Sequence, residues 1–354
     1  MSFFSYFKIA PFFFGSKRQA KIKSNISPKF LLRNSWIVVL LLLFYRIAFS
    51  SYGEQITFIE QPLLALGTFS FVFIYADFIL RGEKKIENYV ALIGLVFSQL
   101  LIGFSSGLLA EMAEVLILFG LVYLNIKKKV LFKTLFFCLF IFFLLNPLKK
   151  EMRSLTWSGS QKLNVVEKAQ IFGGVIARNL SSSDFLDSRN EIVSRVDYTK
   201  TLGQVMAESP ANVPYFLGGT YLPLLTVWIP RFLWPDKPTP AIGNEWAHYY
   251  GLVDTNDFTT SYNLCWLIEF YINFGVWGVL VGMFFCGFFF WVLKKILCSS
   301  PDVTLLEYSV AVTLLWRIWF AEGNFALEFG GVIIGSITLF IYFKALRFFE
   351  RVKS

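Results

Sequence analysis

An arginine flanked by prolines has the residue types and spacing to bind phosphate. Arg231 lies between two prolines in the run VWIPRFLWPDKP, and Lys237 follows it. Because proline restricts its own backbone and that of the preceding residue, the run predicts a rigid segment around a cation. A guanidinium group matches phosphate oxygens, and Trp228 and Trp234 suit the headgroup level of a membrane. The run predicts a site for a lipid-linked pyrophosphate. The alternative is a proline-rich lip whose arginine pairs with Asp236 or a glutamate.

Three residues further along the chain could accept a proton during a reaction. His248 is the single histidine of the chain, and imidazole is a common general base, although a lone loop histidine is more often incidental. Glu269 lies at the start of an apolar run and close to the hydroxyl-rich residues 259–261. It is the stronger candidate, because partial burial makes a carboxylate a better proton acceptor. Glu245 is the reserve candidate.

The composition is that of a membrane protein. Hydrophobic residues make up 56% of the 354 residues, and the mean hydropathy is +0.58, whereas soluble domains are about 45–50% apolar. The net charge of +9 arises from Lys and Arg in short segments beside apolar runs, where they act as topology signals and do not indicate nucleic-acid binding. The four cysteines form no Cys/His cluster, so neither a zinc site nor a disulfide framework is predicted.

The apolar runs predict an all-α polytopic membrane protein with about eight transmembrane helices, each requiring about 20 residues. The predicted helices are residues 36–53, 58–80, 88–106, 108–126, 130–148, 270–293, 303–320 and 326–346. With the N-terminus in the cytoplasm, all basic clusters but one follow the positive-inside rule. The exception, Lys149-Lys150 with Arg153, begins a long segment that would lie on the outer side.

The predicted spans divide the chain into four parts. These are a basic, interfacial cytoplasmic N-terminus (1–35), a five-helix membrane segment (36–148), a large, partly helical periplasmic loop (149–269), and a three-helix segment with a basic cytoplasmic C-terminus (270–354). Inside the loop, residues 215–235 are apolar enough to span but are broken by Gly218-Gly219, Pro223 and Pro230. A span there would move the later basic clusters outside, so an interfacial or re-entrant stretch is predicted.

Ionisable residues inside or beside the predicted spans gather near the outer face. They are Arg46, Glu111, Glu114, Glu269, Arg317, Glu322 and Glu328. This asymmetry favours a site at the outer leaflet over a path through the membrane, since a path needs polar groups at every depth. We expect Arg231 to face a cavity floored by Arg46, Glu111, Glu114 and Arg317. The alternative is that these groups only hold helices together. Asp77, the exception at the inner side, is predicted to pair with Arg81.

Three runs in order carry a family resemblance: YFLGGTYLPLLTVWIPRFLWPDKPTP, NEWAHYYGL and TTSYNLCWLIEFYINFGVWGVLVGM. Together they resemble the central loop and following helix of the bacterial oligosaccharide repeat-unit polymerases, the Wzy-type O-antigen polymerase family. The resemblance covers roughly residues 190–290. It implies a metal-independent, lipid-linked glycosyltransferase in the bacterial inner membrane with its active site facing the periplasm.

The resemblance also implies roles for individual residues. Arg231 and Glu269 or His248 would be catalytic, with Arg231 stabilising the departing pyrophosphate and one of the other two taking a proton from the acceptor hydroxyl. The residues expected to bind pyrophosphate and glycan are Arg195, Arg231, Lys237, Trp234, Tyr250 and Arg317.

The implied partners are an undecaprenyl-pyrophosphate-linked oligosaccharide and membrane lipids, and a chain-length regulator protein is a further candidate. No cofactor, metal or nucleic acid is implied. Two alternatives stay open. They are an O-antigen ligase, which uses the same donor with a lipid A-core acceptor, and a flippase for lipid-linked oligosaccharides. A structural membrane scaffold ranks third.

Overall fold

The computed structural model describes residues 28–49, 57–81, 86, 89–90, 92–97, 109–127, 170, 174, 198–229, 233–258, 260–297, 304–318 and 323–353. Within these ranges the regular structure is helical throughout. The chain divides into two compact units. The first comprises Met1–Phe12, Val196–Val303 and Val310–Ser354, and the second comprises Phe13–Arg195 and Thr304–Ser309.

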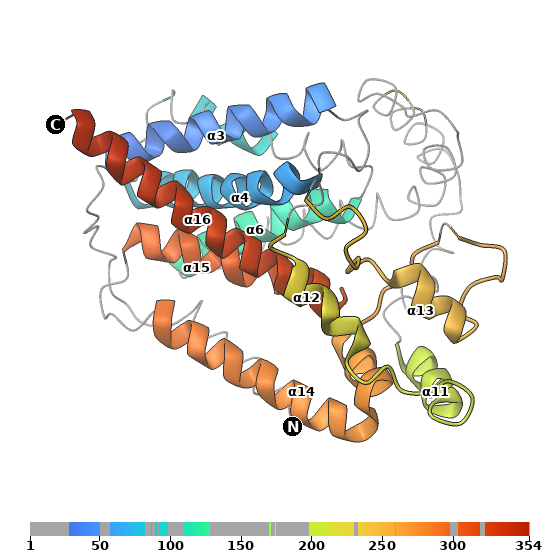
Figure 1. Cartoon of the computed structure of the whole chain (residues 1–354). Helices are drawn as coiled ribbons and strands as arrows, with labels where there is room; N and C mark the ends of the chain where they lie inside the picture. Colours follow the sequence, from blue (N-terminus) through green and yellow to red (C-terminus); the bar gives the residue numbers. More distant parts are fainter. Residues whose placement is uncertain are drawn as a thin grey trace. The chain divides into compact units, whose positions relative to one another are not determined.

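The second unit contains three long apolar helices: α3 (Pro28–Phe49), α4 (Thr57–Arg81) and α6 (Leu109–Lys127). Helices α3 and α4 lie side by side (Figure 1). Their close approach depends on Gly67, because a Cβ atom there would clash with the side chain of Leu42. Arg81 pairs with Asp77 at 2.8 Å, which confirms the predicted ion pair.

The first unit contains most of the remaining elements. They are α11 (Thr199–Glu208), η4 (Gly219–Tyr221, a 3-10 helix), α12 (Leu222–Thr226), α13 (Gly243–Tyr249), α14 (Trp266–Leu297) and α16 (Phe325–Lys353), while α15 (Leu305–Arg317) contributes residues to both units. Helix α12 packs against α16, where Gly330 leaves space for Val227. Residues 215–235 therefore do not form one continuous helix, as the glycines and prolines predicted.

Helix α14 bends sharply near its start, so that its ribbon turns back on itself at one end (Figure 1). The bend lies at Phe274 and Gly275, and Gly275 has a φ of 63°, which is accessible mainly to glycine. The short arm (266–273) folds against the long arm (276–297) because two glycines make room for Phe270. A Cβ atom at Gly282 would lie 2.6 Å from the Phe270 ring, and one at Gly278 would clash with the Phe270 carbonyl.

Three helices in the described part of the chain are long and apolar enough to cross a membrane. They are Ile59–Arg81, Trp266–Val292 and Phe325–Glu350, and the apolar helices Val115–Lys127 and Leu305–Trp316 are shorter. The predicted helices at 58–80, 108–126 and 326–346 are confirmed as helices, and α3 begins before its predicted start at residue 36. The predicted span 130–148 and most of 88–106 lie outside the described residues. The three long apolar helices support the interpretation of the chain as a membrane protein.

The long arm of α14 exposes one broad apolar face. It carries Trp277, Leu280, Val281, Phe284, Phe285, Phe288 and Trp291, all more than half exposed. Their spacing of three and four residues places them on the same side of the helix. An apolar face of this size is unfavourable in water, and in a membrane helix it would lie against lipid.

Candidate functional site

A buried carboxyl group connects three elements of the first unit. Glu269, on the short arm of α14, has no exposed surface. Its Oε1 atom accepts a hydrogen bond of 2.8 Å from the hydroxyl of Thr220 in η4. Its Oε2 atom accepts one of 2.6 Å from the backbone N–H of Phe325 at the start of α16. Both carboxylate oxygens therefore have donors from other elements.

Asn273 extends this network along the same face of the helix, one turn after Glu269. Its Nδ2 atom donates to the Thr220 hydroxyl at 2.8 Å and to the backbone carbonyl of Glu269 at 2.7 Å. Its Oδ1 atom accepts the backbone N–H of Gly218 at 2.8 Å. Glu269, Thr220 and Asn273 form what we call the Glu269 cluster, in which every one of these side chains is buried.

The backbone of residues 216–218 caps the end of the short arm. Phe216 and Leu217 donate their backbone N–H groups to the carbonyls of Ile272 and Asn273 at 3.0 and 3.2 Å. These carbonyls would otherwise lack partners, because the helix breaks immediately afterwards. The turn that aligns the donors has φ angles of 50° at Leu217 and 92° at Gly218, so it relies on the conformational freedom of glycine.

The N-terminus of α16 supplies the second donor to Glu269. Asn324 caps this helix, since its Oδ1 atom accepts the N–H of Leu327 at 3.0 Å. The N–H of Phe325 lies in the first turn, where it has no partner within the helix, and it donates to the carboxylate of Glu269 instead. A helix N-terminus carries partial positive charge, which favours an anion there. The Asn324 amide also donates to the carbonyl of Pro240. This hydrogen bond connects the loop before α13 to the N-terminus of α16.

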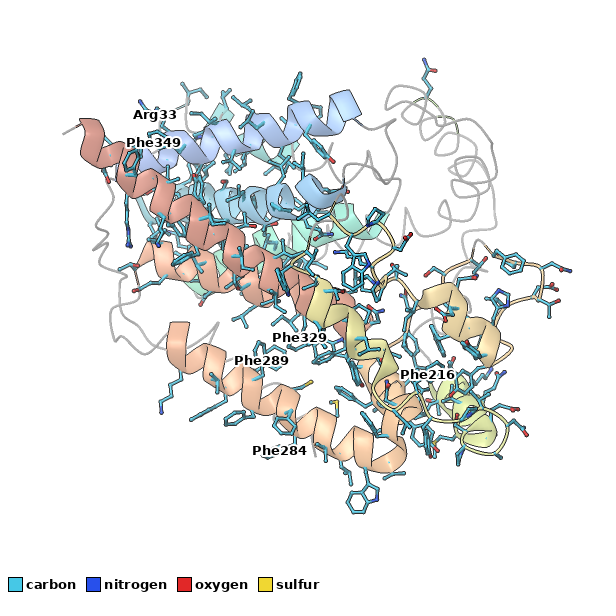
Figure 2. The ribbon with its side chains drawn as sticks, viewed as in Figure 1. Arg33, Phe216, Phe284, Phe289, Phe329 and Phe349 are labelled. Carbon is cyan, nitrogen blue, oxygen red and sulfur yellow. The ribbon has the colours of Figure 1, made fainter. Side chains whose placement is uncertain are left out.

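Aromatic rings pack around the Glu269 cluster. Phe325 stacks on Phe329 with ring centroids 4.0 Å apart, and Phe289 of α14 approaches Phe329 to 5.0 Å (Figure 2). Trp266 and Phe270 lie 5.8 and 5.6 Å from Phe325. This apolar packing strengthens the enclosed hydrogen bonds, because the local dielectric constant is low.

Lys237, predicted to bind pyrophosphate, donates hydrogen bonds to backbone carbonyls at the C-terminal end of α12 and just after it. Its ammonium group donates to the carbonyls of Ile229, Thr226 and Val227 at 2.6, 3.4 and 3.5 Å. Lysine has three N–H donors, and a cation at this place also complements the negative end of the helix. Its role toward pyrophosphate stays a prediction.

His248 stabilises the loop that follows α13. Its Nε2 atom lies 3.0 Å from the carbonyl of Asp257, and its ring lies 5.3 Å from that of Phe258. Asn244 donates to the same Asp257 carbonyl at 2.9 Å. The imidazole therefore already has a structural contact, and its role as proton acceptor stays a prediction.

The other predicted residues of this region differ in exposure. Tyr250 is buried in the core between α11, α13 and α14, and its phenol contacts Ser209 at 2.6 Å. Burial raises the pKa of this phenol, so it acts as a neutral hydrogen-bonding group. Trp234 and Glu245 are exposed, so both remain accessible to a ligand.

Several predicted residues lie beyond what the structure describes. Arg195, Arg231, Glu322 and Arg153 are outside the described residues, and so are the side chains of Arg46, Glu111, Glu114 and Arg317. The expected cavity below Arg231 stays a prediction.

Sequence reasoning missed Thr220 and Asn273. A signal for Asn273 was available, because it follows Glu269 by one helical turn. Thr220 carried no such signal.

The comparison with protein families is informative over nearly the whole chain. Residues 12–353 match a family described as a domain of unknown function, DUF8712. The chain belongs to this family. No curated protein and no solved structure matches the chain. Because the match includes both units, the Glu269 cluster and the apolar helices all lie within the family domain.

Proposed function

We propose that this chain is a polysaccharide repeat-unit polymerase of the bacterial inner membrane. It transfers a growing glycan from undecaprenyl pyrophosphate to a new lipid-linked repeat unit at the periplasmic face. The observation that best supports this proposal is the Glu269 cluster, which attaches the segment leading into Arg231 to two helices long and apolar enough to span a membrane.

The two ends of the segment carrying Arg231 are held together. Ile229 precedes Arg231 and accepts a hydrogen bond from Lys237, which follows it, at 2.6 Å. Thr226, at the end of α12, accepts a second bond from the same ammonium group at 3.4 Å. Residues 229 and 237, on either side of Arg231 in the sequence, are thus held to each other beside a helix that packs on α16. The proposal requires Arg231 to have a limited range of positions, since a phosphate ligand must be held in one geometry.

In the proposed reaction, the acceptor hydroxyl attacks the anomeric carbon of the donor glycan. The bond between that carbon and the pyrophosphate oxygen breaks, and the electron pair leaves with the pyrophosphate. Arg231, with Lys237 and Arg195, neutralises the departing charge, and such electrostatic stabilisation is a large part of catalysis in reactions of this kind. The proton of the acceptor hydroxyl passes to a side chain of the loop, for which His248 and Glu269 are the candidates.

The proposed topology keeps about eight spans and places residues 149–269 outside. It puts the loop of Arg231 at the outer leaflet, where the flipped lipid-linked repeat unit arrives. The aromatic side chains Trp228 and Trp234 are exposed in this region, as stacking on sugar rings or contact with headgroups requires.

Replacing Arg231 in the host tests this function. A strain lacking the chain is complemented with wild type, Arg231→Ala, or the control Lys200→Ala, which removes an exposed cation of α11. We expect wild type and Lys200→Ala to restore a ladder of surface glycan lengths, and Arg231→Ala at equal expression to give one repeat unit per lipid A-core. A full ladder from Arg231→Ala would refute the proposal. Loss of even the single unit would indicate the ligase instead.

A further inference from the structure

We infer that Glu269 is a positioning residue, which anchors η4 to α14 and α16, and that it is not the proton acceptor of the reaction. This inference rests on the proposed function, because it assigns a role within that reaction. It is carried by the enclosure of the carboxylate and by the hydrogen bonds at both of its oxygens.

The carboxylate of Glu269 is enclosed by the protein. A proton acceptor must come within about 2.6–3.2 Å of the hydroxyl that it deprotonates. Glu269 has no exposed surface, and its two oxygens accept hydrogen bonds from Thr220 and Phe325 at 2.8 and 2.6 Å. A substrate hydroxyl would have to enter between η4 and α16 to reach either oxygen.

The hydrogen bonds of the Thr220 hydroxyl have a defined direction. The Thr220 hydroxyl accepts the Asn273 amide and therefore points its own proton at Glu269. The same amide group accepts the N–H of Gly218 through its oxygen. Donors and acceptors are thus matched from Gly218 through Asn273 and Thr220 to Glu269. A network in which each member has its partner specifies one arrangement of the backbone.

The position of η4 also determines where the chain toward Arg231 begins. The network holds η4 against α14, and α12 follows η4 directly. Helix α12 ends at Thr226, which precedes Arg231 in the sequence. Loss of the carboxylate would therefore release the helix before Arg231 without removing Arg231 itself.

Substitution by glutamine separates positioning from proton transfer. Glutamine keeps one oxygen to accept the Phe325 N–H, and its amide nitrogen can donate to the Thr220 hydroxyl, whose own proton then loses its acceptor. Glutamine cannot accept the proton of a substrate hydroxyl. We expect Glu269→Gln to lose less than about tenfold in polymerisation rate, whereas loss of a general base costs about 10²–10⁴-fold. Glu269→Ala should lose the glycan ladder. The control is Asp254→Asn, which changes an exposed carboxyl in the loop after α13.

Hydrogen exchange supplies a readout independent of activity. In Glu269→Ala, we expect amide exchange in peptides containing Gly218 and Phe325 to become about three- to tenfold faster, since the hydrogen bonds that protect them are lost or loosened. In Asp254→Asn these peptides should exchange as in wild type. In Glu269→Gln the peptide containing Phe325 should do so as well, because the glutamine oxygen still accepts that N–H. Thr220→Val, which keeps the shape of the side chain and the carboxylate, should accelerate the Gly218 peptide even if Glu269→Ala fails to fold.

The outcomes distinguish the inference from the proposed function. A Glu269→Gln variant whose Phe325 peptide exchanges at the wild-type rate, but which yields no ladder of glycan lengths, would overturn the inference. Glu269 would then be the proton acceptor, and the polymerase proposal would stand. Wild-type exchange in both Glu269→Ala and Thr220→Val would overturn the anchoring role. A full ladder from Arg231→Ala would reject the polymerase proposal, while the exchange data would still decide whether Glu269 anchors η4.

Discussion

The bend of α14 should be sensitive to a single methyl group at Gly282. A Cβ atom at this position would lie 2.6 Å from the ring of Phe270, well inside van der Waals contact. The ring cannot move away freely, because it is buried and packs against Tyr221 and Phe325 with centroids 6.3 and 5.6 Å apart. Gly282→Ala therefore has to separate the two arms of the helix or displace the aromatic packing around Glu269.

The size of the effect follows from two opposing terms. Overpacking a filled core costs about 1–3 kcal/mol, while replacing glycine by alanine inside a helix gains up to about 1 kcal/mol. Gly282→Ala should thus lower the free energy of unfolding by about 1–2 kcal/mol. Gly287 is the matched control, because it lies in the same helix and a Cβ atom there would meet nothing within 4 Å. Gly287→Ala should be neutral or slightly stabilising.

The assay is a denaturant titration of the purified protein in detergent micelles, with unfolding monitored by tryptophan fluorescence. Wild type, Gly282→Ala and Gly287→Ala are compared under identical conditions. Equal stability of the two variants would refute the close packing of the short arm on the long arm. Exchange of the peptide containing Phe325 should also accelerate in Gly282→Ala alone.

Three further predictions follow from single contacts. Lys237→Met removes the donor to three carbonyls after α12 and should destabilise the local structure by about 1 kcal/mol, seen as faster amide exchange at residues 226–229; unchanged exchange would contradict the assigned contacts. Asn324→Ala removes the N-cap of α16 and the bond to Pro240 and should lower stability by about 0.5–2 kcal/mol, whereas Asn324→Ser, which keeps a capping oxygen, should lose less; equal losses in a denaturant titration would argue against the cap. His248→Ala should loosen the loop around Asp257, detected as faster limited proteolysis there than in the exposed control Tyr249→Ala.

The helices of the membrane segments could be predicted because their signal is composition over about 20 residues. The runs at 58–80 and 326–346 needed no knowledge of neighbours to be identified as helices. The interruption at 215–235 was also visible, since two adjacent glycines and two prolines within about 20 residues disfavour one continuous helix. These features depend on local chemistry, so the sequence alone contains them.

The bend in α14 and the Glu269 cluster depend on contacts between distant segments. Gly275, Gly278 and Gly282 resemble ordinary glycines of a membrane helix in the sequence, and only the folded chain shows that two of them accommodate Phe270. Glu269 was singled out as chemically active, but its partners Thr220 and Phe325 lie 49 and 56 residues away. No periodicity links such positions, so neither the enclosure of the carboxylate nor the anchoring of η4 could be predicted.

Conversion of lipid-linked repeat units by the purified protein tests the proposed function most directly. Repeat units are extracted from a host strain that lacks the chain, and wild type or Arg231→Ala is added in lipid vesicles. We predict that wild type releases undecaprenyl pyrophosphate and joins the units into longer glycans on the lipid, and that Arg231→Ala does neither. Units left unchanged by well-folded wild-type protein, or lengthened equally by Arg231→Ala, would contradict the account.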